Sequence, residues 1–315
     1  MASEQTSEQH ALAQATANVS QPESGGRAAG GIQSVEPSRS RKTLGRLVRH
    51  KSAMLGLSIL IVLVLAALLA PLIAPYDPTK ISRDVMQAPS LNHLMGTDNL
   101  GRDVFTRVLY GARISLQMGF IAVAIAASIG TLIGVISGTY GGWVDGFFMR
   151  FIDALMALPG ILLALTVAAT LGPGLYNAMI AVGVAWIPSF ARIVRSSVLQ
   201  INETTYVEAA RASGASDFRL IMRHILPNAM AAVLVLASLG VATAILVGAA
   251  LSFLGIGASP PTPEWGIMLS DGRQFMRSAW WIMAFPGLAI TVTVLGANLV
   301  GDGLRDVFDP RMGSR

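Results

Sequence analysis

A polar, basic segment at residues 205–228 lies between two long apolar segments and holds the side chains best suited to binding another molecule. Thr205 and Glu208 have the spacing of a capping box, in which a hydroxyl and a carboxylate each satisfy a free backbone N–H at a helix start. Alanines then favour helix, and Gly214 stands where a left-handed helix end is expected. The spacing therefore predicts a short helix that ends in a glycine turn.

A second short helix is predicted to begin at Ser216, and Pro227 is expected to discourage its continuation. Its apolar residues recur at i, i+3, i+4 and i+7 and so share one face: Phe218, Ile221, Met222 and Ile225. Three arginines accompany this face, either to contact acidic groups of a partner or to stay in solvent or lipid: Arg211, Arg219 and Arg223. Two interpretations of the apolar face remain open. It docks another protein, or it packs on the membrane domain of this chain.

A second group of charged residues lies within residues 77–112, where four basic side chains are balanced by four acidic ones. Asp98 is expected to cap a short helix along the membrane surface, and Asp103 and Arg107 have the spacing of an i, i+4 ion pair. This helix is either a structural elbow into the next membrane span or a landing surface for an external partner.

Several kinds of chemistry are absent from the sequence. It contains no Gly-Lys pair, and therefore no phosphate-binding loop of the kind that cradles ATP. It has no cysteine, and its four histidines are scattered, so no metal site is predicted. No long apolar stretch carries a central acid or base, which argues against ion-gradient coupling through a buried carboxylate. We predict neither a catalytic residue nor a bound cofactor in this chain.

Composition predicts an all-α integral membrane protein, because hydrophobic residues make up 53% of the chain and charged residues only 13%. Gaps between charges predict six spans in a membrane domain at residues 52–312. The spans lie at about residues 52–76, 114–144, 147–171, 176–190, 229–255 and 279–301. Kinks are expected at Pro159-Gly160 and at Pro188. Arg150 and Asp153, one turn apart at one end of the third span, are expected to form a local ion pair or to anchor the interface.

The distribution of basic residues predicts the orientation. Residues 1–37 have the composition of a disordered cytosolic tail, and residues 38–51 carry six basic side chains and no acid. Nucleic acid is one partner for such a cluster, but its place before a span favours anionic lipid. Lys and Arg number fifteen in the predicted inner segments and seven in the outer ones. Both termini and residues 205–228 are therefore expected in the cytosol.

Two motifs resemble those of a known family. Glu208-Ala209-Ala210, Gly214 and Ile225-Leu226-Pro227 resemble the EAA loop of ABC-importer permeases. A second stretch is similar to a signature of the dipeptide, oligopeptide and nickel branch. Its residues are Gly96, Thr97, Asp98, Gly101, Arg102, Asp103, Arg107, Gly111 and Arg113. The resemblance covers about residues 40–312.

The resemblance implies a type I importer permease of six transmembrane helices in a bacterial inner membrane. Its cytosolic coupling helix would fit a cleft on an ATP-binding subunit. The implied partners are a second permease, two ATP-binding subunits that hold ATP and magnesium, and an external substrate-binding protein. The cargo would be a dipeptide, an oligopeptide or a related solute such as a nickel complex. Two rival classes are a secondary transporter or channel and a scaffold that anchors a cytosolic ATPase.

Overall fold

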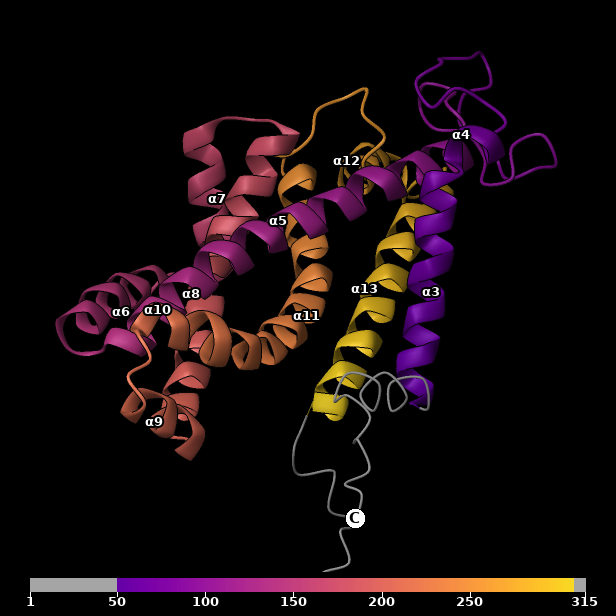
Figure 1. Ribbon diagram of the computed structural model, residues 1–315. Coiled ribbons are helices and arrows are strands. Elements are labelled where there is room, and N and C mark those ends of the chain that lie inside the picture. Colours follow the sequence, from indigo (N-terminus) through magenta and orange to yellow (C-terminus); the bar gives the residue numbers. More distant parts are fainter. Residues whose placement is uncertain (1–49, 309–315) are drawn as a thin grey trace, which may run out of the picture. The chain divides into compact units, whose positions relative to one another are not determined.

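The computed structural model describes residues 50–308, and every named element among them is helical (Figure 1). The α-helices are α3 (Lys51–Leu68), α4 (Ala70–Ile73), α5 (Val104–Tyr140), α6 (Gly142–Met156), α7 (Gly160–Leu171), α8 (Leu175–Asn202), α9 (Thr205–Ala212), α10 (Asp217–Leu220), α11 (Leu226–Phe253), α12 (Trp265–Gly272) and α13 (Trp281–Phe308). A π-helix, η1 (Ile221–Ile225), and a 3₁₀-helix, η2 (Arg273–Phe275), complete the set. The predicted tail at 1–37, most of the basic segment at 38–51 and residues 309–312 lie outside the described residues.

Five helices within residues 50–308 are long and apolar enough to cross a membrane: α3, α5, α8, the α10–η1–α11 run and α13. The pair α6 and α7 meets the same criterion only when taken together, and it is bent by 92°. The prediction of six spans therefore corresponds to five unbroken helical spans and one bent pair. The kink expected at Pro159-Gly160 in the third span is confirmed, and it is a break between two helices, because Pro159 takes an extended conformation between them.

Helix α5 begins earlier than the sequence predicts. Its 37 residues correspond to about 55 Å at 1.5 Å per residue, well beyond the hydrocarbon core of a bilayer. The expected surface helix in the 77–112 loop is the first part of this long helix, not a separate element. Asp103, not Asp98, caps it, because the Asp103 carboxylate accepts a hydrogen bond from the Thr106 N–H at 2.8 Å.

The most extensive helix pairing within residues 50–308 is between α5 and α8. Glycines at every fourth position of α5, Gly130, Gly134 and Gly138, face α8. A Cβ atom added at Gly134 would lie 2.7 Å from the Ala191 carbonyl oxygen and 2.8 Å from the Val194 Cβ. The two backbones therefore approach as closely as glycine permits, as in other tightly packed membrane helices.

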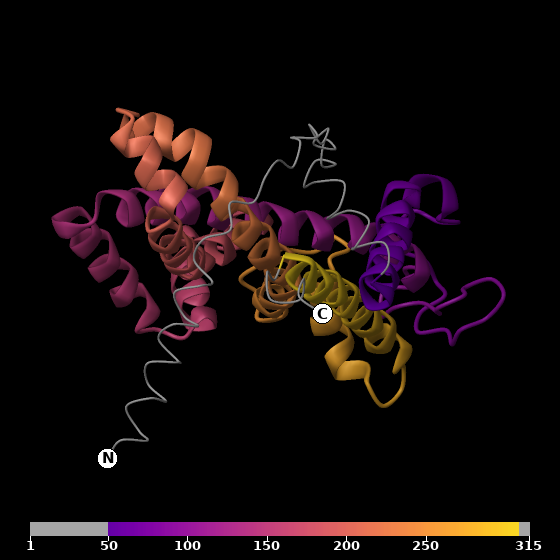
Figure 2. The ribbon, with the colours of Figure 1, turned by 60° about the horizontal axis from the view of Figure 1, so that its bottom comes forward.

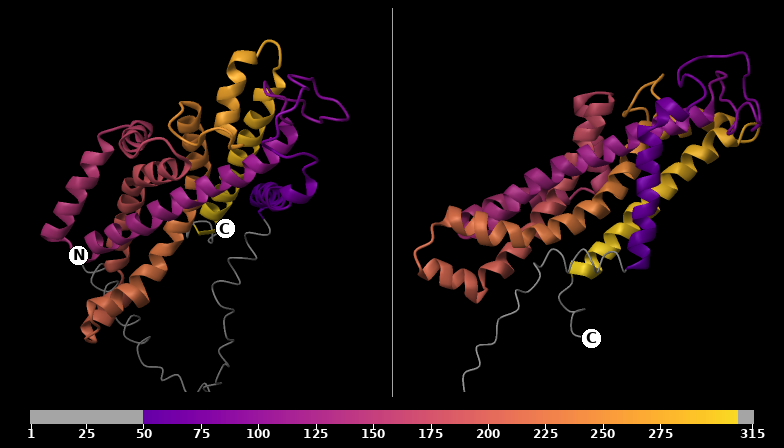
Figure 3. Two further views of the ribbon diagram at one scale, coloured as in Figure 1. Left: turned by 90° about the horizontal axis from the view of Figure 1, so that it is seen from above. Right: turned by 45° about the vertical axis from the view of Figure 1, so that its right-hand side comes forward.

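Buried side chains form one large cluster on α5, α7, α8 and α11 and a second among α3, α5, α11, α12 and α13. Helices α3 and α13 lie side by side (Figures 1 and 3). Both helices leave large apolar side chains exposed. On α3, Val62 is 64% exposed and Leu68 is 62% exposed. Such aliphatic surface is expected to face lipid.

Candidate functional site

The segment between α8 and α11 is a helical hairpin of α9, α10 and η1 that stands at one end of the helices (Figure 2). Its first helix starts as the alanine-rich sequence predicts, but the capping box is wrong. Thr204, not Thr205, occupies the cap position, and its hydroxyl donates backwards to the Ile201 carbonyl at 2.5 Å. Glu208 consequently falls one residue too late for the box, and it lies exposed in the first turn of α9.

Gly214 makes the predicted turn at the end of α9. Its φ is +80°, a value that side chains with a Cβ atom disfavour. The Gly214 N–H donates to the Arg211 carbonyl at 3.0 Å, and the Ala215 N–H donates to the Ala210 carbonyl at 3.1 Å. This pair of bonds is a Schellman motif, so the turn between the two arms of the hairpin has one defined geometry.

The sequence analysis expected the second arm to end near Pro227, but the helix continues through this residue. Pro227 lies in the first turn of α11, and α10, η1 and α11 follow one another without a break. A single π turn precedes the proline, with the Leu226 N–H bonded to the Ile221 carbonyl. The wider turn makes room where the proline ring would clash in a regular α-helix. The hairpin is therefore a direct extension of α11.

The predicted apolar face divides into a buried and an exposed part. Ile225 is fully buried, as are Val207 and Leu220, which the sequence analysis did not single out. Phe218 is 74% exposed and Met222 is 50% exposed. The two interpretations of this face therefore apply to different residues: one set fixes the hairpin to the membrane domain, and the other is free.

The remaining candidate residues of the hairpin are mostly exposed. Those on the surface are Glu208, Ala209, Arg211, Gly214, Arg219, Arg223 and Pro227, and the partly buried ones are Ala210, Ile221 and Leu226. The rings of Tyr206 on α9 and His224 on η1 lie 6.1 Å apart and connect the two arms. The hairpin thus exposes two apolar side chains, three arginines and one glutamate.

The second candidate group folds into a buried ion-pair cluster. Asp98 accepts from the Arg102 Nε at 2.6 Å, and the same carboxylate lies 3.6 Å from the Arg107 Nε. Arg102 also reaches Asp271 on α12, with 3.4 Å between Nη2 and Oδ2. All these side chains except Asp271 are almost fully buried. The predicted pair between Asp103 and Arg107 does not form, because Arg107 turns towards Asp98.

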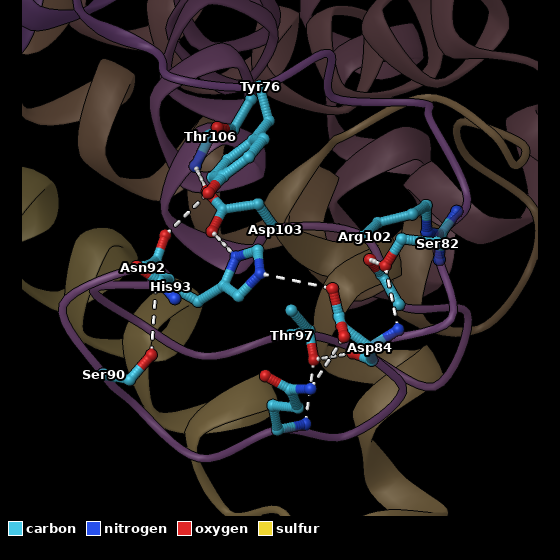
Figure 4. Close-up of polar contacts among 12 residues, drawn as sticks. Tyr76, Ser82, Asp84, Ser90, Asn92, His93, Thr97, Arg102, Asp103 and Thr106 are labelled. Atoms are coloured by element: carbon cyan, nitrogen blue, oxygen red, sulfur yellow. Dashed lines mark hydrogen bonds and ion pairs between the residues drawn. The ribbon is translucent and has the colours of Figure 1, made fainter.

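Asp103 instead holds a histidine beside the cap of α5. Figure 4 shows His93 with its Nδ1 2.9 Å from an Asp103 oxygen and its Nε2 4.0 Å from Asp84. The His93 ring stacks on Tyr76, with 4.9 Å between ring centroids. The signature stretch is therefore mainly internal packing, which supports the elbow interpretation. Gly96, Thr97, Gly101 and Gly111 are buried with it, and Arg113 is exposed.

Two acidic residues at α12, Glu264 and Asp271, were not assigned as site residues in the sequence analysis. Glu264 is fully buried and caps α12 by accepting from the N–H groups of Gly266 and Ile267 at 2.9 and 3.0 Å. Burial raises its pKa, and burial likewise raises the pKa of Asp271 despite the nearby arginines. The sequence analysis did not predict α12, because the prolines shortly before Glu264 are typical of a loop. A short helix after a glutamate cap has no strong sequence signal.

Ion pairs also connect α6 to α8. Asp145 binds the Arg195 guanidinium through two contacts of 2.5 Å, and Asp153 binds Arg192 at 2.6 Å. The local ion pair between Arg150 and Asp153 does not form, because Asp153 binds an arginine of another helix. The alternative expectation, that the two residues anchor the interface, stays a prediction. Within residues 50–308, no three acidic or histidine side chains gather as a metal site would require.

Comparison with known proteins identifies the family. Residues 130–314 match the model for the binding-protein-dependent transport system inner membrane component. The chain belongs to this family. Residues 38–93 also match the N-terminal transmembrane domain of oligopeptide transport permease C. The protein is thus a multi-pass permease subunit of an ABC importer, and the EAA-like hairpin lies inside the larger match.

Similar proteins cover most of the permease. The dipeptide transport system permease DppC of Alkalihalophilus pseudofirmus is 49% identical over 276 residues, which are 87% of this chain and 90% of that protein. The glutathione transport system permease GsiD of Escherichia coli is 49% identical over 269 residues, 85% and 89% of the two chains. An inward-facing structure of the MetNI methionine ABC transporter shares the fold, with a TM-score of 0.53 and 21% identity over 65% of this chain and 98% of that one.

Proposed function

We propose that this permease forms half of the translocation path of a peptide importer and that the α9–α10 hairpin couples it to an ATP-hydrolysing subunit. One observation carries the coupling role. Phe218 and Met222 are exposed on a hairpin whose own core residues, Val207, Leu220 and Ile225, are fully buried. Apolar side chains held outward on a firmly anchored helix are typical of a contact that another protein completes.

The cargo that we propose is a small peptide. The relatives at 49% identity are permeases of a dipeptide transport system and of a transport system for glutathione, a tripeptide. The nickel complex considered from the sequence is not needed to account for these similarities.

We further propose the assembly expected from the sequence. A second permease completes the path, two ATP-binding subunits hold ATP and magnesium, and an external binding protein delivers the cargo. This chain does not hydrolyse ATP itself. Both termini and the hairpin face the cytosol of a bacterial cell, and residues 77–112 face outward, as the bias of Lys and Arg favours.

In this mechanism the hairpin transmits motion to two spans at once. Helix α8 leads into α9, and the second arm continues into α11 through the π turn. Displacement of the hairpin when the ATP-binding subunits close would therefore tilt α8 and α11. Because α8 packs closely on α5, it would move together with that helix. Glu208 and the three arginines would set the orientation of the docked hairpin through contacts with charged groups of the motor subunit.

The experiment is to replace Phe218 and Met222 by serine in the complete transporter reconstituted in vesicles. Since both side chains are exposed, the permease should still fold. Association with the ATP-binding subunit should weaken at least tenfold, and ATP-driven peptide uptake should fall with it. Tyr176→Ser is the matched control, because Tyr176 is 73% exposed but lies at the start of α8, away from the hairpin.

Three outcomes would contradict the proposal. Normal association and uptake in the serine variant would remove the coupling role. Uptake by this chain alone under an ion gradient would favour a secondary transporter. If the wild-type chain associates normally with the ATP-binding subunit but the assembly takes up no peptide, the chain is a scaffold that anchors the ATPase.

A further inference from the structure

A cavity of about 520 Å³ opens between α8, α11 and α13. Its walls come from one face of each long helix, including Ser197 and Gln200 on α8 and Asn228, Val235 and Leu239 on α11. Arg305 of α13 supplies the single charge among the lining residues. The volume lies in the range of sites that hold small organic molecules, about 300 to 1,000 Å³.

The lining changes in character along the helices. Gln200 lies two residues before the end of α8 and Asn228 two residues after the start of α11, so both amides lie at the hairpin end. Further along α11 the wall consists of aliphatic side chains, including Val235 and Leu239. A ligand that fits this cavity therefore carries both hydrogen-bonding groups and apolar groups.

The polar groups match those of a peptide. The Asn228 amide nitrogen already donates to the His224 carbonyl at 2.6 Å, which leaves its oxygen to accept a peptide N–H. Gln200 offers both a donor and an acceptor. Arg305 is exposed, and the neighbouring Asp306 forms its ion pair with His50 at 3.0 Å instead. The guanidinium is thus suited to bind a terminal carboxylate.

We propose that this cavity is a binding site for the peptide cargo within the permease, with Arg305 binding the terminal carboxylate. The Gln200 and Asn228 side chains bind the peptide groups, and the aliphatic wall accepts the cargo's side chains. This inference rests on the proposed function and names the residues that contact the cargo. The cavity walls are the two helices that flank the hairpin, so movement of the hairpin would change the width of the site.

The chain has no cysteine, so one introduced thiol can report on the cavity. Ser197→Cys places the thiol in the lining, and Ser196→Cys places it on the exposed neighbouring position outside the lining. The complete transporter, without its binding protein, is treated with a water-soluble maleimide at increasing concentrations of trialanine or its C-terminal amide. Labelling of this chain is read by mass spectrometry.

Trialanine should slow labelling in the Ser197→Cys variant at least fivefold and leave the Ser196→Cys variant unchanged. Adding Arg305→Ala should raise the half-protecting concentration of trialanine about tenfold and bring it to that of the amide, because only the free carboxylate uses the guanidinium. Arg305→Lys should restore part of the difference. Arg277→Ala, an exposed arginine before α13, is the control and should change nothing.

Equal protection at both serine positions, or an unchanged preference for the acid after Arg305→Ala, would overturn the proposal. Protection by added phospholipid but not by trialanine would also overturn it and assign the cavity to lipid. Uptake of trialanine by the same wild-type preparation, with binding protein added, is measured in parallel. If uptake occurs without protection, the cargo site alone is wrong. If no uptake occurs, the proposed function fails instead.

Discussion

Glu264 illustrates how burial decides the behaviour of a single carboxyl group. A carboxylate at a helix start is normally favoured by the backbone N–H groups and the helix dipole. Here those N–H groups and the Ser115 hydroxyl, 3.3 Å away, do not offset complete removal from water, and the pKa is raised. The protonated form is therefore favoured by folding.

The first prediction is a pH-dependent difference between the wild type and Glu264→Gln. Because the pKa of Glu264 is higher in the folded protein than its ordinary value of 4.5, the folded state binds the proton more tightly. The stabilisation that results is present below about pH 4.5 and is lost as the pH rises through the raised pKa. Glutamine does not titrate. The Tm of Glu264→Gln, relative to the Tm of the wild type, should therefore rise as the pH is raised above about 4.5.

Thermal unfolding in detergent between pH 4 and pH 8 measures this difference. The change in the gap between the two Tm values with pH is the readout, since a constant offset reports only the altered hydrogen bonds. A gap that stays constant across the range would contradict a raised pKa at Glu264.

At the scale of helices, the contact between α5 and α8 depends on the absence of side chains. Gly134→Ala would place a methyl group 2.7 Å from a backbone oxygen, where neither helix can easily yield. Overpacking of this kind costs about 1 to 3 kcal/mol of unfolding free energy. Gly146→Ala in α6 is the matched control, because an added Cβ meets no atom within 4 Å there. The first variant should lower the Tm in detergent and the second should leave it unchanged or raise it.

The hairpin turn gives a prediction that separates coupling from packing. At Gly214 an added Cβ meets no atom within 4 Å, so Gly214→Val costs only the strain of a left-handed backbone, about 1 to 2 kcal/mol. The assembled transporter should hydrolyse ATP but lose most of its peptide uptake. Gly214→Asn, which tolerates this conformation, should keep most of it. Equal uptake by both variants would show that the turn geometry is not required.

The hydropathy pattern of the sequence predicts some features of these helices and not others. It located the apolar segments, because their transfer to lipid is a property of composition. The proline at 159 predicted where the third span bends, but the pattern gave neither the angle of 92° nor the early start of α5. Asp103 and Asp98 are both good cap residues, and only the fold selects between them.

The hairpin was predicted in position but not in detail. An α-helical period placed Phe218, Met222 and Ile225 on one face, whereas the buried pair is Leu220 and Ile225, five residues apart. The π turn takes more residues per turn than an α-helix and so changes which side chains point inward. The motif residues gave no signal for it, because the turn accommodates a proline that was expected to end the helix.

At the scale of the whole molecule, the orientation in the membrane can be tested directly. In the cysteine-free chain, Phe218→Cys marks the hairpin and Leu91→Cys marks the loop at 77–112, where Leu91 is 96% exposed. A membrane-impermeant maleimide should label only Leu91→Cys in right-side-out vesicles and only Phe218→Cys in inverted ones. The reverse pattern would place the hairpin outside, beyond the reach of any cytosolic ATPase.

The ion pair between Arg102 and Asp271 joins residues 169 positions apart in the sequence. During synthesis the ribosome therefore releases Asp98, Arg102 and Arg107 long before their last partner exists. Until α12 emerges, Arg102 lacks its partner Asp271, and the contact between α12 and the segment before α5 is not yet formed. The cluster is therefore complete only after α12 has been synthesised. A protein truncated before residue 265 would lack Asp271 and expose the incomplete cluster to membrane proteases.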